Sequence, residues 1–179
     1  LEEIIALVRT ESGVRGRSIG IYPETKHPSW HCGQGHALEP ALLAALERAG
    51  WTTRAAPVFI QSFEAGNLQW LRPRTGVRLV QLLDGAGLTV DGRTEPARRW
   101  RPEGHCKAFG AVAPPDDFSS AASFAEIAKW ADAVGPWKRH LIGTRATVAE
   151  DRSEATRRTL TPTAFVALAH AAGLGVHPW

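Results

Sequence analysis

The sequence predicts an α/β fold, a parallel sheet joined by helical crossovers, and two observations carry this prediction. Helical and strand patterns alternate along all 179 residues, which is typical of parallel sheets. Each predicted strand also begins with apolar residues and ends with polar or aromatic ones. No internal repeat or low-complexity tract interrupts the pattern, so we expect residues 1–179 to form a single domain.

The elements are predicted from periodicity and from their end signals. Leu1, Ile4, Ile5 and Val8 have the i, i+3, i+4, i+7 spacing of an amphipathic helix. The predicted helices comprise this opening helix, residues 38–49, residues 64–71, a helix opened by a capping box at Ser123-x-x-Glu126, and residues 161–172, where Thr161 precedes Pro162. The predicted strands are residues 18–26, 57–63, 77–83, 131–138 and 174–179.

The polar strand ends favour a (β/α)8 barrel. Such barrels keep their active sites at the C-terminal ends of the strands. A doubly wound sheet would follow the same rule, but no glycine-rich turn follows any predicted strand to hold a phosphate. The two long connections, residues 85–119 and 139–159, are predicted to be polar loops. The residues at the strand ends are Glu24, Lys26, Gln61, Ser62, Gln81, Asp84, Lys138 and His177.

Composition argues against several classes of protein. The net charge is +3, and the arginines are spread along the chain without the basic stripe of a nucleic-acid-binding protein. This mild excess favours attraction of anionic substrates. No apolar run approaches the roughly 18 residues of a membrane helix. We therefore expect a small-molecule ligand, no nucleic acid and no membrane span.

The segment Tyr22 to Lys26 is the strongest local signal for chemistry. Alternate residues of a strand share a face, so Tyr22, Glu24 and Lys26 are predicted to point the same way. A carboxylate is a hard ligand for a divalent cation, and an ammonium group is a point charge for a phosphate. A simple ion pair at the mouth of the barrel explains the same spacing, so the spacing leaves both interpretations open.

Five segments give the chain a resemblance to a known family. They are Gly20–Lys26 (GIYPETK), Phe59–Phe63 (FIQSF), Leu79–Leu82 (LVQL), Trp130–Pro136 (WADAVGP) and Val176–Trp179 (VHPW). In order and spacing they resemble the glycerophosphodiester phosphodiesterases over nearly the whole chain. The resemblance implies a (β/α)8 TIM barrel that hydrolyses glycerophosphodiesters to an alcohol and glycerol 3-phosphate with a divalent cation, Ca²⁺ or Mg²⁺.

The resemblance also implies roles for individual residues. Glu24 would be a metal ligand and Lys26 a phosphate contact, while Phe63 and Trp179 would lie near the glycerol side of the pocket. The catalytic histidines and the other two acidic ligands of the family belong to its first two strands and the following loop, which would precede Leu1. We therefore expect a fragment with strands matching the third to the seventh, an incomplete barrel that is inactive alone. Long loops of this kind are typical of exported family members.

Other interpretations remain beside this one. The chain could be a non-catalytic barrel that binds phosphate or sugar, or a truncated product without function. His31, Cys32, His36, His105 and Cys106 offer nitrogen and sulfur for zinc, but their spacing fits no standard zinc finger. The two cysteines fit a disulfide and two free thiols equally well.

Overall fold

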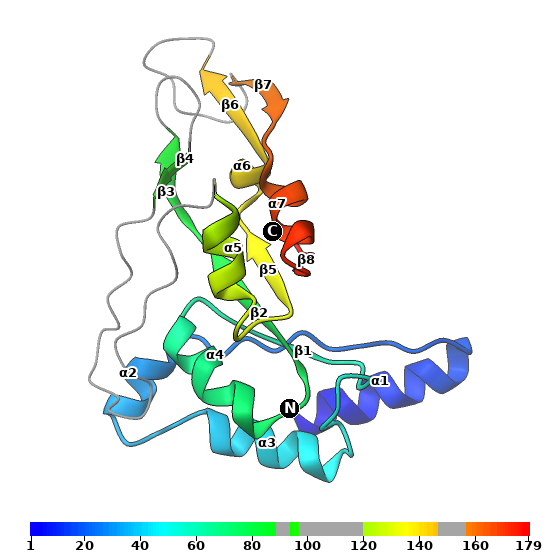
Figure 1. Ribbon diagram of the computed structural model, residues 1–179. Helices are drawn as coiled ribbons and strands as arrows, with labels where there is room; N and C mark the ends of the chain where they lie inside the picture. Colours follow the sequence, from blue (N-terminus) through cyan, green and yellow to red (C-terminus); the bar gives the residue numbers. More distant parts are fainter. Residues whose placement is uncertain (89–93, 97–119, 147–156) are drawn as a thin grey trace. The chain divides into compact units, whose positions relative to one another are not determined.

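The structure, a computed structural model, describes residues 1–88, 94–96, 120–146 and 157–179 (Figure 1). They form a mixed α/β fold with a parallel sheet, as the sequence predicts. The described residues fall into two compact units, with the first ending at Gln81 and the second beginning at Leu82. That residues 1–179 form one domain stays a prediction. Among the described residues, no helix has both the length and the apolar character needed to cross a membrane.

The first unit is mostly helical around two parallel strands. β1 and β2 pair in parallel, with Phe59 beside Arg78 and Gln61 beside Val80. The elements of this unit are α1 (Glu2–Arg15), α2 (Pro28–Gly33), α3 (Glu39–Arg48), β1 (Phe59–Ser62), α4 (Ala65–Leu71), the 3-10 helix η1 (Arg72–Arg74) and β2 (Arg78–Leu83), whose last two residues belong to the second unit.

The second unit combines the parallel strands β5 and β8 with two antiparallel pairs, β3 with β4 and β6 with β7. The hydrogen-bonded order of the parallel sheet is β1-β2-β5-β8. The remaining elements are β3 (Gly85–Leu88), β4 (Thr94–Pro96), α5 (Ala121–Ile127), β5 (Ala133–Pro136), α6 (Lys138–Leu141), β6 (Ile142–Ala146), β7 (Arg157–Pro162), α7 (Phe165–Ala171) and β8 (Gly175–Val176).

Each unit has its own buried apolar residues. In the first unit they come from the helices, from β1 and β2 and from the residue before each strand, and include Leu46, Val58, Ile60, Leu68, Leu71, Val77, Leu79 and Val80. In the second they include Leu83, Phe124, Ile127, Val134, Phe165, Ala169 and Leu174. Phe124 of α5 meets Phe165 of α7 edge to face, with ring centroids 4.9 Å apart. This contact ties the two helices together.

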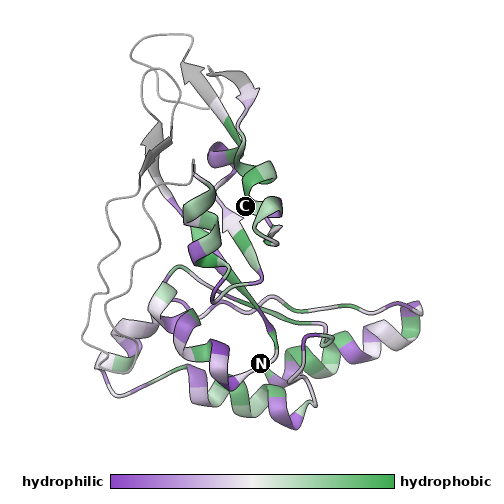
Figure 2. Cartoon of the chain, viewed as in Figure 1, coloured by the Kyte–Doolittle hydropathy of each residue, from purple (hydrophilic) through white to green (hydrophobic). Residues whose placement is uncertain are grey.

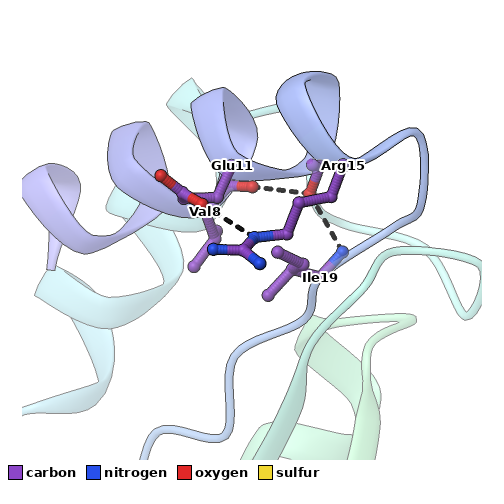
Figure 3. Close-up of polar contacts among 5 residues, drawn as sticks. Val8, Glu11, Arg15 and Ile19 are labelled. Carbon is purple, nitrogen blue, oxygen red and sulfur yellow. Dashed lines mark hydrogen bonds and ion pairs between the residues drawn. The ribbon is translucent and has the colours of Figure 1, made fainter.

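The opening helix is confirmed, but its predicted apolar face is largely exposed. Of the four residues that set its period, only Ile5 is buried, whereas Ile4 is 53% exposed. Figure 2 shows hydrophobic residues interspersed with hydrophilic ones along α1. The helix ends at Gly16, whose φ of 60° is left-handed. Ser12 then donates to the Val8 carbonyl and accepts from the Ile19 amide, beside the Arg15–Glu11 ion pair (Figure 3).

Several predicted strands are shorter in the structure than in the sequence analysis. Residues 18–26 form only two isolated parallel bridges, at Ile21 and Glu24. The strands predicted at 131–138 and 174–179 reduce to Ala133–Pro136 and Gly175–Val176. Lys138 therefore lies in α6 and not at a strand end. The apolar pattern located these strands correctly, but backbone pairing alone decides where each one ends.

Two predicted helix starts are wrong. The N-cap of α5 is Ser120, whose hydroxyl accepts from the Ser123 amide. Ser123 therefore lies within the helix, although Phe124 and Ile127 are buried as predicted. The last predicted helix begins only at Phe165, because Thr161 and Pro162 form the end of β7, where Pro162 pairs with Ile142 of β6. A neighbouring strand here overrides the local capping signal.

The two long connections are not simple loops where they are described. Residues 85–119 include β3 and β4, and residues 139–159 include most of α6, all of β6 and the start of β7. Residues 90–93, whose sequence VDGR is typical of a turn, lie outside the described residues. His105 and Cys106 also lie outside them. Cys32 is disulfide-bonded, so its sulfur is not available as a zinc thiolate.

Candidate active site

The segment that carries Glu24 and Lys26 runs beside β1 as extended backbone. Ile21 bridges Val58 and Glu24 bridges Gln61, both in parallel. At the first bridge, the Ile21 amide donates to the Pro57 carbonyl at 2.9 Å. At the second, the Thr25 amide donates to the Gln61 carbonyl at 3.0 Å. The segment is thus held at both of its ends, to β1 and to the two residues that precede it.

Alternation along this segment divides it into two faces, as predicted. Tyr22, Glu24 and Lys26 are exposed, whereas Thr25 between the last two is buried at 3% exposure. Two side chains that lie on one extended segment with a buried residue between them project to the same side. The exposed face of the segment therefore presents a carboxylate and an ammonium group together.

The interpretation of Glu24 and Lys26 as a simple ion pair finds no support in the described residues. Ion pairs that form among the described residues include Arg15–Glu11, Arg48–Glu2 and Lys129–Glu126. Neither Glu24 nor Lys26 joins a described partner. Both charged groups are open to solvent and to a ligand of opposite charge.

A layer of rings and a guanidinium group lies next to these two charges. Tyr22 stacks on Phe59 of β1, with ring centroids 5.4 Å apart and planes 15° apart. The Arg78 guanidinium of β2 lies over the Phe59 ring, 3.9 Å from its centroid. Tyr22 keeps 38% of its surface exposed, and the burial of the rest of its side chain raises the pKa of the phenol, so this ring stays neutral.

Phe63 follows β1 directly and is half-buried. Its backbone carbonyl accepts from the side-chain amide of Gln81 at 3.0 Å. Gln81 itself is fully buried in β2. The hydrogen bond from Gln81 therefore fixes the backbone of Phe63 just after the end of β1. Phe63 lies two residues after Gln61, the bridge partner of Glu24. The structure brings Glu24, Lys26 and Phe63 onto neighbouring segments of the first unit.

A buried polar network lies beneath the exposed segment. The Thr25 hydroxyl donates to Asn67 Oδ1 at 2.8 Å, and the Asn67 side-chain nitrogen donates to Glu39 Oε1. Thr25, Asn67 and Glu39 are 3%, 0% and 1% exposed. Burial raises the pKa of the Glu39 carboxyl, and the charge of nearby Glu64 raises it further, against the opposing effect of the Asn67 hydrogen bond.

A second buried carboxylate fixes the turn after Lys26. Glu64 accepts from the Ser29 amide with both oxygens at 3.2 Å and also from the Ser29 hydroxyl. Burial raises the pKa of Glu64, while the Ser29 hydrogen bonds and the nearby His27 lower it. His27 adopts a left-handed φ of 48° immediately before Pro28 opens α2. A non-glycine residue in this region is strained and is often held there near functional sites.

Trp179 lies in the second unit, at the end of the described chain. Its indole nitrogen donates to the Gly135 carbonyl at 3.1 Å, and its backbone amide donates to the Pro136 carbonyl at 3.1 Å. Its carbonyl accepts from the Lys138 amide at 2.9 Å. The ring is still 50% exposed. The backbone of Trp179 is thus fixed to β5, while part of its ring remains available.

The second unit also contains a partly buried histidine, His140. One of its ring nitrogens, Nε2, lies 3.0 Å from the Asp84 carbonyl oxygen. Burial lowers the pKa of this imidazole, and the hydrogen bond to Asp84 opposes that shift. Since a carbonyl only accepts, the proton sits on Nε2 when the bond forms. The sequence analysis did not select this residue.

The comparisons with known proteins bear on this geometry. No family model matches the chain. The chain is 26% identical over 141 residues to a glycerophosphodiester phosphodiesterase of Haemophilus influenzae, which covers 75% of the chain and 36% of that protein. It is 25% identical over 147 residues to one of Treponema pallidum, covering 79% and 38%. It is 26% identical over 175 residues to glycerophosphodiester phosphodiesterase GDPD6 of Arabidopsis thaliana, covering 91% and 40%.

The chain is related to the glycerophosphodiester phosphodiesterases. This confirms the resemblance first seen in its five motif segments. The chain spans about two fifths of the length of these relatives. The roles of Glu24, Lys26, Phe63 and Trp179 in a phosphodiesterase remain predictions.

Few of the described residues could hold a cation. Within residues 1–88, 94–96, 120–146 and 157–179, no three His, Cys, Asp or Glu residues gather as a metal site. Glu24 offers one exposed carboxylate without a described partner, which suits a hard divalent cation. The donor chemistry fits, and further ligands would have to come from outside this set.

The sequence analysis missed the buried polar residues beneath the segment. Glu39 precedes Pro40 at the start of a helix, where an acidic residue normally reads as a solvent-exposed group favoured by the helix dipole. Glu64 and Asn67 flank the start of a short helix in the same way. The sequence signal at both positions is a polar residue near a helix start, which does not reveal burial.

Proposed function

We propose that the protein to which this chain belongs hydrolyses glycerophosphodiesters to an alcohol and glycerol 3-phosphate, with Ca²⁺ or Mg²⁺ as cofactor. The relatives carry the name of this activity. The observation that supports it best is the joint exposure of Glu24 and Lys26 on one face, with Thr25 buried between them. The fold we propose for the whole is a (β/α)8 barrel, to which the parallel strands and their helices would contribute.

The chemistry assigns a separate task to each of these residues. Glu24 would bind the divalent cation, which supplies Lewis-acid neutralisation of the non-bridging phosphate oxygens. Lys26 would place a second positive charge on the same phosphate. Phe63 and the exposed part of the Trp179 ring would contact the glycerol side of the substrate. Charge stabilisation at preorganised groups of this kind is the largest contribution in many enzymes.

The acid and base of the reaction are not supplied by recognisable motifs in these 179 residues. The family resemblance implies histidines in His-Arg and His-Asp elements. None of the seven histidines of the chain is followed by Arg or Asp. The general acid to the leaving alcohol would therefore come from other parts of the protein. Glu24 and Lys26 would bind and orient the phosphate for it.

An exported location fits this proposal. Cys32, in α2 just beyond Lys26, is disulfide-bonded. Disulfides persist in oxidising compartments and are rare in the cytosol.

The alternative to an enzyme, a barrel that binds phosphate or sugar without hydrolysis, uses the same exposed charges. Turnover alone separates these two functions.

The test is release of glycerol 3-phosphate from glycerophosphocholine, measured with this segment in its natural sequence context. Hydrolysis should need added Ca²⁺ or Mg²⁺ and stop when a chelator is added. Glu24→Gln should lower kcat/KM by about 100-fold or more, since it removes a ligand of the cation that would stabilise the transition state. Glu47→Gln, a change at an exposed glutamate of α3, is the matched control.

Metal-independent turnover, or equal activity in Glu24→Gln and Glu47→Gln, would rule out the proposed site. Binding of glycerol 3-phosphate without turnover would favour the non-catalytic barrel. Both variants should be shown to unfold at the same urea concentration, so that a loss of activity reflects the carboxylate and not the fold.

A further inference from the structure

Thr25 is the most firmly held residue of the exposed segment. Its amide donates to the Gln61 carbonyl at 3.0 Å, and its carbonyl accepts from the Ser62 hydroxyl at 3.1 Å. Its own hydroxyl donates to Asn67 Oδ1 at 2.8 Å. Every polar group of Thr25 is therefore used. Because Thr25 joins Glu24 to Lys26, its position sets where both charged side chains leave the backbone.

The orientation of Asn67 decides the direction of its hydrogen bond with the Thr25 hydroxyl. An asparagine side chain carries an acceptor oxygen and a donor nitrogen, and only the oxygen can accept from Thr25. Asn67 is fully buried, so no water corrects a wrong orientation. Its nitrogen donates to Glu39 Oε1. If the amide were reversed, two oxygens would face each other at Glu39, which buried groups do not tolerate.

Glu39 thus fixes the orientation of the Asn67 amide by accepting a hydrogen bond from its nitrogen. The carboxyl is 1% exposed, and its second oxygen, Oε2, has no hydrogen-bond partner among the described residues. Burying a carboxyl oxygen that has no hydrogen-bond partner lowers the stability of the fold. An apolar residue in this helix position would pack without that penalty. Glu39 is therefore expensive for stability alone, which indicates a role in placing Asn67.

We propose that Glu39 is a positioning residue that acts through Asn67 to hold Thr25, and with it the segment that presents Glu24 and Lys26. The consequence for catalysis rests on the function proposed above. The structural part is independent of that function. It states that the buried carboxyl of Glu39 orders one end of the segment that carries Glu24 and Lys26. The two parts are therefore tested by separate measurements.

The structural part is tested by amide hydrogen exchange in the 179-residue chain. Thr25 and Ile21 provide a matched pair, because both amides bond to carbonyls beside β1 from the same segment. Glu39→Leu should speed exchange at Thr25 by about tenfold, the loss of one buried hydrogen bond. Exchange at Ile21 should stay unchanged. Glu39→Gln keeps an acceptor for Asn67 and should restore the Thr25 rate.

Thr25→Val is a second variant that tests the same hydrogen bond if Glu39→Leu does not fold. It keeps the β-branched shape and removes only the hydroxyl, so it should speed exchange at residue 25 and leave Ile21 unchanged. Equal acceleration at both amides would show a general loss of stability and overturn the proposal. Unchanged exchange at residue 25 in Glu39→Leu and Thr25→Val would overturn it as well.

The catalytic part is tested in the glycerol 3-phosphate assay. Glu39→Leu should lower kcat/KM by about tenfold with Glu39→Gln near the unchanged protein, as expected for a misplaced binding group. If the unchanged protein shows no turnover, the proposed function fails while the exchange result still decides the positioning role. If turnover is normal in Glu39→Leu but Thr25 exchanges faster, the segment does not need this order for catalysis and the catalytic part is wrong.

Discussion

Glu24 bridges Gln61 in parallel, three residues after Ile21 bridges Val58 in the same register. This relationship places the carboxylate of Glu24 beside the end of β1, on the exposed side of the backbone. Such strand ends are where barrel enzymes keep their catalytic groups. The buried side of the same segment, at Thr25, joins the network through Asn67 to Glu39. One short segment thus links an exposed charge pair to a buried polar support.

The buried residues of β1 should dominate the stability of the first unit. Ile60 is fully buried, whereas Ile4 in α1 is 53% exposed. Ile60→Ala should lower the free energy of unfolding by about 2–5 kcal/mol, from lost burial and the cavity left behind. Ile4→Ala removes the same atoms and should cost about 0.5 kcal/mol or less. Urea unfolding followed by circular dichroism measures both, and equal losses would contradict the assigned burial.

Stability should depend on pH through Glu39. Its pKa in the folded chain is raised above the ordinary value of 4.5 by burial. The unfolded carboxyl releases its proton first, so the folded chain loses stability as the pH rises from about 4.5 through the folded pKa. Glu39→Gln does not ionise and should gain stability relative to the unchanged chain over that range.

The measurement for this prediction is the difference in unfolding free energy between Glu39→Gln and the unchanged chain at several pH values. Groups common to both, including Glu64 and His140, contribute equally and cancel unless they couple to residue 39. Since Glu64 faces Glu39 and also has a raised pKa, Glu64→Gln is the second variant to measure. A difference that does not change with pH would show that Glu39 titrates normally.

The left-handed backbone of His27 should favour glycine over alanine. Both His27→Gly and His27→Ala remove the imidazole and its attraction to Glu64, so that loss is common to the two variants. They differ in tolerance of the φ of 48°. The glycine variant should be more stable by about 1 kcal/mol, because a left-handed conformation costs an L-residue about that much. Thermal unfolding that ranks alanine above glycine would show that the turn relaxes.

Cys32 should resist alkylation until a reductant is added, because it is disulfide-bonded. Iodoacetamide followed by peptide mass spectrometry should find the peptide with Cys32 unmodified in the oxidised chain and modified after reduction. Modification without a reductant would show a free thiol, and the argument for an oxidising compartment would lose its support.

The sequence predicted the parts of the fold that depend on local periodicity. The alternation of Tyr22, Glu24 and Lys26 is set by strand geometry and was predictable. The helix at 38–49 appears as Glu39–Arg48, with Leu42 and Leu46 buried. The strand ends were not predictable in the same way, because they depend on which backbone groups a neighbour offers. Thr161 and Pro162 have a good helix-start pattern and still end β7.

The support of the candidate site was not predictable either. Glu39 and Asn67 come from two different helices and meet only through tertiary packing. Polar residues near helix starts normally read as exposed caps. A single sequence contains no signal that these ones turn inward. Their burial appears only when the helices lie against the sheet.

The most direct test of Glu24 as a metal ligand is paramagnetic broadening by Mn²⁺ in the nitrogen-15 NMR spectrum of this chain. Mn²⁺ prefers the same hard oxygen ligands as Mg²⁺ and Ca²⁺, and broadening reveals even weak binding. The amide signals of Thr25 and Gln61, which flank Glu24, should broaden first. Glu24→Gln should abolish this effect, and Glu47→Gln should retain it. Broadening that is centred elsewhere, or that persists in Glu24→Gln, would contradict the assignment of Glu24 to the metal.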